Sequence, residues 1–288
     1  MRGFRRLLAL ACTLCTLLSG PSIAIEAAQA PETGAVVDGV YRNAYFGFAY
    51  RLPDGWIEGA AGPLPSARGY YVLESASPEE APTGMVLIAA QDEFFAARKF
   101  ADAATMARDF ERSTAAVDGM SIDRSATDVV ISGHHFSRVD FSGVGLYRAM
   151  LVTELRCHLV SFNLTSRDPA LLQNLVASLD GLVFAAGDEQ SEMPACVENY
   201  ASGGNLQYRV EPVAAGPKFM AVPVRIVIAR DGRVKHLHVI HGTEEQRQAI
   251  AEALANWRFK PYRGARETEE VETGLLFRFA AVSNSTGD

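Results

Sequence analysis

Apolar and polar residues in the first two thirds of the chain follow two different periods, and each period predicts its own elements. Alternation over residues 45–51 predicts a strand, which ends at the turn sequence Leu52-Pro-Asp-Gly55. Another extended stretch is predicted to begin at residue 56. Apolar runs predict further strands over residues 70–73, 85–89, 129–131, 135–143 and 147–165. Helical spacing of apolar residues predicts a helix over residues 100–115. Asp168-Pro169 predicts the start of a second helix that ends near Leu179.

Residues 222–279 carry a more regular pattern. Two strands over residues 222–228 and 234–240 flank the sequence Ala229-Arg-Asp-Gly-Arg233, which predicts a hairpin. Thr243 and Gln246 have the spacing of a capping box, and apolar side chains then follow one helical stripe up to Trp257. A last strand is predicted over residues 270–279. The order strand, strand, helix, strand predicts a small three-stranded sheet with one helix on one face.

A polar, glycine-containing stretch divides the chain near residue 190. Residues 187–195 are therefore predicted to link a domain over residues 38–186 to a second domain over residues 196–282. Strands gathered between two helices predict a mainly antiparallel sheet with flanking helices in the first domain. The predicted fold class is α+β, with two domains.

The first thirty residues predict a targeting segment. Three arginines precede an apolar run over residues 7–18, a break follows at Ser19-Gly-Pro21, and the segment ends Ala28-Gln29-Ala30. This pattern is typical of a cleaved secretory signal peptide over residues 1–30. A retained inner-membrane anchor is the alternative, because the stretch to Ile25 approaches the ~20 residues that span a bilayer if the break is tolerated. The protein is expected to contact a membrane only in that case.

The 288 residues include 27 basic and 34 acidic side chains, a net charge of −7. This balance provides no basic field for phosphates, which argues against nucleic acid as a partner. Once residues 1–30 are removed, only Cys157 and Cys196 remain, in a compartment where disulfides form. They are candidates for one disulfide, worth up to about 4 kcal/mol in the chain-entropy model. A buried free thiol at Cys157 is the other interpretation, since Leu155 and Leu159 share its strand face.

Residues 41–56 have the sequence Tyr-Arg-Asn-Ala-Tyr-Phe-Gly-Phe-Ala-Tyr-Arg-Leu-Pro-Asp-Gly-Trp. They resemble the start of PsbP-like α/β/α domains, which often open with an Asn-x-x-Phe-Gly-Phe strand followed by Pro-x-Gly-Trp. The late strands and the helix before Leu182-Val-Phe184 fit the same family. The resemblance covers residues 40–185. It implies a fold more than an activity, because such domains serve mostly as binding or assembly modules.

Residues 216–280 resemble the TonB C-terminal domain family. The matching features are the hairpin turn Asp231-Gly232, the helix end Trp257-Arg-Phe-Lys-Pro-Tyr262 and the final Phe277-Arg-Phe279. The family's Tyr-Pro element before the first strand and its long Pro-rich spacer are absent. The resemblance is therefore to the shorter TonB-like domains of secreted bacterial proteins more than to a dedicated energy transducer.

The TonB-like resemblance implies an interaction surface at a sheet edge, where an extended peptide adds a strand. The expected edge is the last strand, with Val271, Thr273, Leu275, Phe277 and Phe279. The expected partner is a protein or an extended peptide in the periplasm. The family's link to transport makes an outer-membrane protein the natural candidate.

The sequence contains no motif for enzymatic chemistry: no nucleophile elbow, His-Glu-x-x-His, phosphate loop or dinucleotide fingerprint. No catalytic residue and no cofactor are predicted. His236 and His238 are the best metal candidates because they share a strand face, but two imidazoles do not complete a zinc site. The favoured interpretation places both on the solvent side of a half-buried hairpin and predicts no metal.

These observations predict a non-enzymatic, exported protein-binding module of the periplasm with a link to outer-membrane transport. Two alternatives stay open. In one, the first domain binds a small ligand or metal and the second only docks it. In the other, a retained N-terminal segment anchors a TonB-type energy transducer in the inner membrane.

Overall fold

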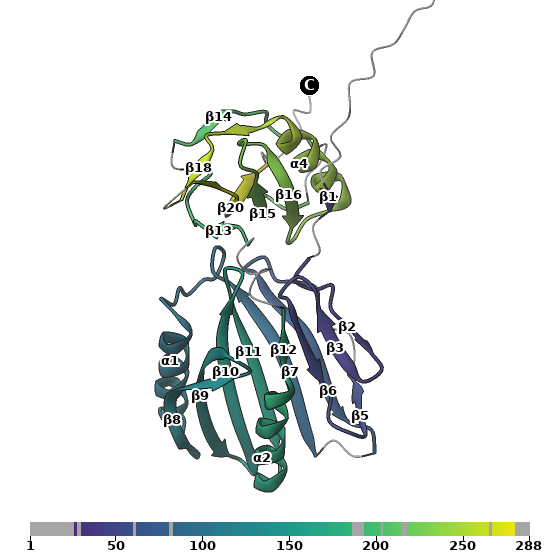
Figure 1. Ribbon diagram of the computed structural model, residues 1–288, viewed down its shortest axis with the longest axis vertical. Helices are drawn as coiled ribbons and strands as arrows, with labels where there is room; N and C mark the ends of the chain where they lie inside the picture. Colours follow the sequence, from purple (N-terminus) through teal and green to yellow (C-terminus); the bar gives the residue numbers. More distant parts are fainter. Residues whose placement is uncertain are drawn as a thin grey trace, which may run out of the picture.

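The protein is built mainly of β-sheet, with few helices (Figure 1). The computed structural model describes residues 26–27, 30–59, 62–80, 83–185, 193–202, 204–214, 218–264 and 267–279. These residues form several sheets, and separate hydrophobic cores lie in the two parts of the chain. We refer to residues 30–185 as the large unit and to residues 193–279 as the small unit. The architecture is α+β, as the sequence predicts.

The large unit is organised around a seven-stranded sheet in which every neighbouring pair is antiparallel. Its strands, in order across the sheet, are β5 (Trp56–Glu58), β6 (Tyr70–Pro78), β7 (Gly84–Asp92), β11 (His158–Ser166), β10 (Leu146–Leu155), β9 (His134–Gly143) and β8 (Met120–Ile131). Neighbours in the sheet are mostly neighbours in sequence, so short hairpins make most of the connections. The antiparallel arrangement agrees with the prediction.

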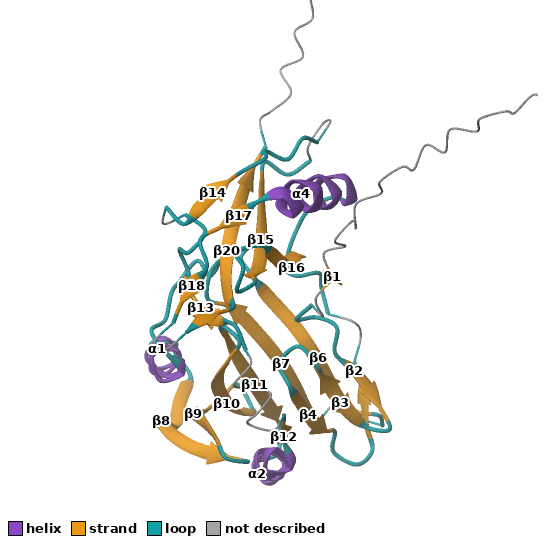
Figure 2. Cartoon of the chain, turned by 45° about the horizontal axis from the view of Figure 1, so that its top comes forward, coloured by secondary structure: helices purple, strands orange, loops and turns teal. Residues whose placement is uncertain are grey.

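Different elements cover the two faces of this sheet. Helix α1 (Ala103–Ala115) packs on the face that carries Met150 and Val152. The face that carries Ala149 and Leu151 packs against α2 (Pro169–Ser178) and a second sheet. The second sheet contains, in order, β12 (Val183–Phe184), β4 (Phe48–Arg51), β3 (Val40–Asn43) and β2 (Ala35–Val37), and the 3-10 turn η1 (Leu179–Gly181) leads into it. Figure 2 shows α1 and α2 nearly end-on, with strands between them.

Side-chain caps determine where the two helices of the large unit begin. Asp102 accepts a hydrogen bond from the backbone N–H of Thr105 at 2.6 Å, so α1 begins at Ala103 and not at residue 100. Asp168 accepts a hydrogen bond from the backbone N–H of Ala170 at 2.9 Å, and a proline follows it in the first turn. Helix α2 therefore begins where the sequence predicts.

The small unit contributes four strands of a five-stranded sheet that has α4 (Glu244–Asn256) on one face; the fifth, β1, comes from the chain before both units. The order of the sheet is β1 (Glu26–Ala27), β16 (Val234–Val239), β15 (Ala221–Ile228), β20 (Val271–Arg278) and β13 (Ala195–Cys196). Two short ladders complete the unit, β14 (Leu206–Tyr208) with β17 (Arg258–Phe259) and β18 (Tyr262–Arg263) with β19 (Thr268–Glu269). Val224 and Ile226 share a core with Leu254 of α4. Thr243 and Gln246 form the predicted capping box.

The strand predictions differ from the structure in several places, and two of these differences concern sheet edges. The small sheet has five strands where the sequence predicts three, because β1 and β13 add two residues each from outside the predicted core. The strand predicted over residues 129–131 is the end of β8, which begins at Met120. Strand β8 lies at the edge of its sheet and is largely exposed, so its sequence lacks the apolar alternation of an inner strand.

Within the described part of the chain, no helix combines the length and the apolar composition needed to cross a membrane. The apolar run of the predicted signal peptide, residues 7–18, lies outside the described residues.

Candidate functional site

The two units meet on the face of the small sheet that α4 leaves uncovered. On β15, Val224 and Ile226 point toward the core under α4, so the alternation of the strand turns Arg225 toward the large unit. The register places Arg225 opposite Gly274 of β20. A Cβ atom at Gly274 would lie 2.8 Å from the Cβ of Phe94, so only glycine lets the loop after β7 lie directly against the sheet.

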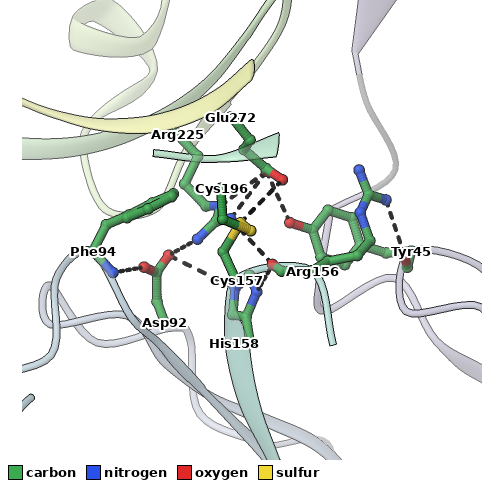
Figure 3. Close-up of a disulfide and its surroundings, with 9 residues drawn as sticks. All are labelled: Tyr45, Asp92, Phe94, Arg156, Cys157, His158, Cys196, Arg225 and Glu272. Carbon is green, nitrogen blue, oxygen red and sulfur yellow. Dashed lines mark hydrogen bonds and ion pairs between the residues drawn. A yellow bond between two sulfur atoms is a disulfide. The ribbon is translucent and has the colours of Figure 1, made fainter. Parts of the chain in front are cut away.

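Arg225 is the centre of a buried charge cluster between the units (Figure 3). Only 2% of this residue is exposed. Its Nη1 donates to Asp92 Oδ2 at 2.6 Å, and its Nε donates to Glu272 Oε1 at 3.1 Å. Its Nη2 donates to the backbone carbonyl of Arg156 at 3.3 Å, and the guanidinium carbon lies 4.6 Å from the ring centroid of Phe94. One side chain of the small unit thus contacts three separate segments.

Asp92 is oriented by groups of the large unit. It is the last residue of β7 and has no exposed surface. The backbone N–H of Phe94 donates to its Oδ1 at 2.7 Å, which leaves Oδ2 for Arg225. His158 Nε2 lies 3.7 Å from the same Oδ2, and Nδ1 of that ring is 2.6 Å from the carbonyl oxygen of Arg156. The carboxylate is therefore fixed before the small unit contacts it.

Tyr45 brings the turn before β4 into the cluster. Its hydroxyl donates to Glu272 Oε1 at 3.2 Å. The Arg156 guanidinium carbon lies 4.1 Å from the Tyr45 ring centroid, and Arg156 Nη1 donates to the Tyr45 carbonyl at 2.9 Å. Glu272 therefore accepts hydrogen bonds from both units. We call this set of side chains the interface cluster: Tyr45, Asp92, Arg156, His158, Arg225 and Glu272.

A disulfide joins Cys157 to Cys196 beside the interface cluster (Figure 3). The two residues are 39 positions apart, and their Cα atoms are separated by 5.7 Å, an ordinary distance for a disulfide. Cys157 is buried in the turn between β10 and β11, whereas Cys196 is exposed on β13. Of the two interpretations that the sequence leaves open, the structure has the disulfide. It joins the large unit covalently to the small unit.

Burial and neighbouring charges together set the protonation of the cluster. Burial lowers the pKa of His158 well below its usual range, and the charge of Arg225 lowers it further. Burial raises the pKa of Asp92, and Arg225 opposes that rise. Burial alone would lower the pKa of Arg225, but the Glu272 and Asp92 carboxylates hold it well above its ordinary value. Arg225 is therefore charged and His158 neutral.

This arrangement is suited to holding the units together. The cavity against the cluster has a volume of about 10 Å³, which is room for about one water molecule. The hydrogen bonds of Arg225 are directed at protein groups of both units. Buried ion pairs between distant segments favour one arrangement of those segments over others. We therefore interpret the cluster and the disulfide as the connection that fixes the small unit on the large one.

The candidate metal ligands His236 and His238 lie on β16 and line the same small cavity. The side chain of His238 is only 13% exposed, with its Nε2 3.5 Å from Glu32 Oε2 and its ring centroid 6.3 Å from that of Tyr71. Burial lowers the pKa of His238 to about 4, and two nearby arginines reinforce the effect. The solvent-facing placement predicted for His238 is wrong because the large unit covers this face. No three His, Cys, Asp or Glu residues of the described chain are placed to hold a metal ion.

The unpaired edge of the last strand, β20, is shorter than the sequence predicts. Strand β13 pairs in parallel with β20 at Val271 and Glu272, and Thr273 Oγ1 donates to the backbone carbonyl of Glu198. The chain itself therefore occupies this end of the edge. The side chains of the five residues predicted to form the edge are instead directed inward. Four of them, Val271, Leu275, Phe277 and Phe279, pack in or against the core under α4, and Thr273 is buried beside it. On this side of β20, no strand among the described residues pairs with the backbone beyond Glu272.

Analysis of the sequence did not identify Arg225, Asp92 or Glu272. A signal was present, because each is a charged residue within or at the end of a strongly apolar strand. Such residues are almost never fully buried unless they are paired. A charge in this position therefore predicts a buried partner, but it does not identify that partner.

Comparison with known proteins gives only distant structural similarity for this chain. No family model matches the chain, and no curated protein sequence matches it. Among solved structures, it is similar to the solution structure of cyanobacterial PsbP (CyanoP) from Synechocystis sp. PCC 6803. The identity is 14% and the TM-score 0.36, over 50% of this chain and 91% of that one. The comparisons thus show only a weak structural similarity to a PsbP protein. They do not support the TonB-like resemblance of residues 216–280.

Proposed function

We propose that the protein binds an extended segment of another protein along the outer edge of β20. The supporting observation is the stretch from Gly274 to Arg278. The segment at β13 donates hydrogen bonds to the carbonyls of Glu270 and Glu272. Because a strand alternates with period two, the backbone groups of Gly274, Leu276 and Arg278 point to the same outer side. Within the described chain, no strand pairs with them.

This stretch has the dimensions and the side chains for strand addition. Five residues of antiparallel strand extend about 17 Å, which is a typical strand length. Leu276 is 47% exposed, and the side chain of Arg278 is also exposed. Main-chain hydrogen bonds would supply affinity in this mode, and an exposed apolar side chain would add contact area. The interface cluster and the disulfide would hold this edge in one orientation.

The biological setting of the proposal comes from the sequence. Residues 1–30 are taken as a signal peptide that directs the chain to the periplasm. A PsbP-like domain over residues 38–186 and a linker over residues 187–195 then precede a TonB-like domain over residues 196–282. On this basis the partner is an outer-membrane protein with an extended periplasmic segment. The protein itself is expected to be non-enzymatic.

A proline substitution at Leu276 tests the proposed edge. Leu276→Pro removes one outward N–H while it spares the hydrogen bonds to β15, so the fold is expected to survive. Overlapping 12-residue peptides from the outer-membrane proteins of the host would be arrayed and probed with the chain from residue 31. The affinity of the best peptides would then be measured by fluorescence polarisation. We expect Leu276→Pro to weaken binding about tenfold or more, since a hydrogen bond is lost and the ring obstructs the added strand.

Leu276→Ala is the matched control, because it shortens the same side chain but keeps the N–H. Its expected loss is smaller, about threefold, from the contact area alone. Thermal unfolding of both variants would verify that the small unit is folded. Equal affinities for wild type and Leu276→Pro, with the fold intact, would refute binding at this edge.

A further inference from the structure

A second feature of the large unit is a pocket between the strand pair β5–β6 and the chain that follows β5. Its volume is about 250 Å³, slightly below the ~300–1,000 Å³ of ordinary small-molecule sites. It therefore suits a ligand of only a few heavy atoms. Its lining includes the carboxylates of Glu32, Glu58 and Glu74 and the hydroxyl group of Ser75. The rest is mostly short and apolar, as at Leu64 and Val72.

Glu74 is the unusual residue of this pocket. It is only 5% exposed, and its Oε1 has no hydrogen-bond partner among the described residues. The register between β6 and β7 shifts between Val72 and Glu74, so Leu73 and Glu74 are both buried although they are consecutive. A buried carboxylate oxygen without a partner is costly, and native proteins rarely keep one without a reason.

The surroundings of Glu74 lack a compensating positive charge. The neighbours that shift the pKa of Glu74 are the Glu58 carboxylate on β5 and the backbone N–H of Ser75, and no basic side chain is among them. Tyr41 on β3 is close enough for both carboxylates to raise its pKa. The third glutamate, Glu32, lies toward His238. Among the neighbours that act on Glu74, no basic side chain therefore offsets its charge when it is ionised.

The wall of the pocket is fitted closely onto β6. A Cβ atom at Gly59 would lie 2.4 Å from Ser75 Oγ, and one at Gly62 would lie 2.7 Å from the Cβ of Val72. Glycine at both positions lets this chain segment run directly over the strand. The pocket is consequently bounded by backbone at Gly59 and Gly62.

We propose that this pocket binds a small organic cation, of the short-chain alkylammonium class. The ammonium N–H groups would donate to Glu74 and Glu58, and the hydrocarbon chain would lie against Leu64 and Val72. A bare metal ion fits less well, because no group of three or more metal-ligating side chains exists among the described residues. This site is separate from the β20 edge, so the two proposals stand or fall independently.

The protonation of Glu74 gives the site a characteristic pH dependence. Burial, and next the charge of Glu58, raise the pKa of Glu74 to about 7. The carboxylate is thus mostly protonated at pH 6 and mostly ionised at pH 8. Cation binding is therefore expected to strengthen about tenfold between these two pH values. The groups that face Glu74 are Glu58, Tyr41 and the Ser75 N–H, and none of them reverses this direction.

Calorimetric titration with n-butylammonium tests the proposal, with n-butanol as the uncharged analogue of the same shape. We expect saturable binding of n-butylammonium at pH 8, about tenfold weaker binding at pH 6, and no binding of n-butanol. Glu74→Gln keeps the shape of the side chain and removes its charge, so binding should fall tenfold or more. Glu79→Gln, the same change at an exposed residue just after β6, is the matched control and should alter binding less than twofold.

Glu74→Gln is expected to fold, because it removes an uncompensated buried charge. Should it fail to fold, Glu58→Gln tests the same site at an exposed position, with about threefold weaker binding expected. Three results would each overturn the proposal: no saturation with n-butylammonium at pH 8 up to about 50 mM, equal binding of n-butanol, or unchanged binding by both folded variants.

Discussion

Arg225 is withdrawn from water, and protein groups take the place of its hydration shell. Transfer of an isolated charge into the interior is expensive, and the attraction of nearby opposite charges offsets that cost only when the geometry is good. Here Asp92 accepts at 2.6 Å and Glu272 at 3.1 Å, while the ring of Phe94 lies over the guanidinium. These groups depend on one another, because each carboxylate is buried as well. Loss of the arginine alone should therefore cost more than loss of the whole set.

Substitution of Arg225 by methionine tests this dependence. Arg225→Met leaves Asp92 and Glu272 buried and facing each other, and we expect the free energy of unfolding to fall by about 3–5 kcal/mol. Urea denaturation followed by fluorescence would measure it. The triple variant Arg225→Met, Asp92→Asn, Glu272→Gln removes the charges together and should recover at least half of that loss. A single variant as stable as the wild type would show that the ion pairs do not hold the units together.

His238 makes stability depend on pH in the acidic range. Its pKa is lowered to about 4 by burial and by Arg225, whereas an unfolded histidine titrates near 6.5. Between these values the unfolded chain binds a proton that the folded chain does not, so acidification favours unfolding. We expect the free energy of unfolding to fall by up to about 3 kcal/mol from this residue between pH 6.5 and pH 4. The charged groups that face it are Glu32, Arg225 and Arg247.

Urea denaturation of the wild type and His238→Gln at pH 7 and pH 4.5 would measure this contribution. The variant cannot titrate there, so its stability should fall less over the same interval. Parallel losses in the two proteins would mean that His238 contributes nothing to acid sensitivity.

At the scale of elements, the turn between β10 and β11 connects local geometry to the interface. Leu155 pairs with His158, so Arg156 and Cys157 form a two-residue hairpin loop. Both have positive φ, +47° and +57°, in a turn that usually contains asparagine and glycine. A non-glycine residue in this region costs about 1 kcal/mol or more. The side chains explain why arginine and cysteine occupy these positions. Arg156 stacks on Tyr45, and Cys157 forms the disulfide.

Removal of the disulfide should destabilise the protein without opening the interface at neutral pH. In the chain-entropy model a link across about 40 residues contributes about 4 kcal/mol, by restricting the unfolded chain. The double variant Cys157→Ala, Cys196→Ala should therefore unfold at lower urea concentration than the oxidised wild type. Dithiothreitol should lower the midpoint of the wild type and leave that of the double variant unchanged. Equal midpoints for the oxidised wild type and the double variant would contradict this account.

The last strand shows how an element can be predicted correctly while its role is not. A strand over residues 270–279 follows from alternation, and β20 occupies Val271–Arg278. Alternation also identifies which side chains share a face. The side chains of the five residues predicted to form the edge share the face that is turned toward the core. The identity of the neighbouring strand depends on where β13 lies, which no local pattern determines. The edge available to a partner is therefore shorter than predicted. It consists of the outward backbone groups of Gly274, Leu276 and Arg278.

At the scale of the whole molecule, the small sheet lies between α4 and the ends of strands from the large unit (Figure 1). One of its faces is apolar and packs on a helix, while the other carries Arg225, Glu272 and His238 and packs on the large unit. Because the disulfide and the buried Arg225–Asp92 ion pair both join the two units, we expect the units to move as one body. The proposed peptide edge and the proposed cation pocket would then keep a fixed separation.

Features that depend only on neighbours along the chain could be predicted from the sequence. The start of α2 at Asp168-Pro169, the capping box of α4 and the hairpin turn at Asp231-Gly232 need only residues within a few positions, and each forms as predicted. The tertiary structure decided the pairing of Arg225 with Asp92, the joining of Cys157 to Cys196 and the burial of Glu74. The first of these pairs is 133 positions apart. Such contacts arise only when whole sheets pack, because the free energy that favours them comes from burial and charge pairing between surfaces that no local sequence pattern brings together.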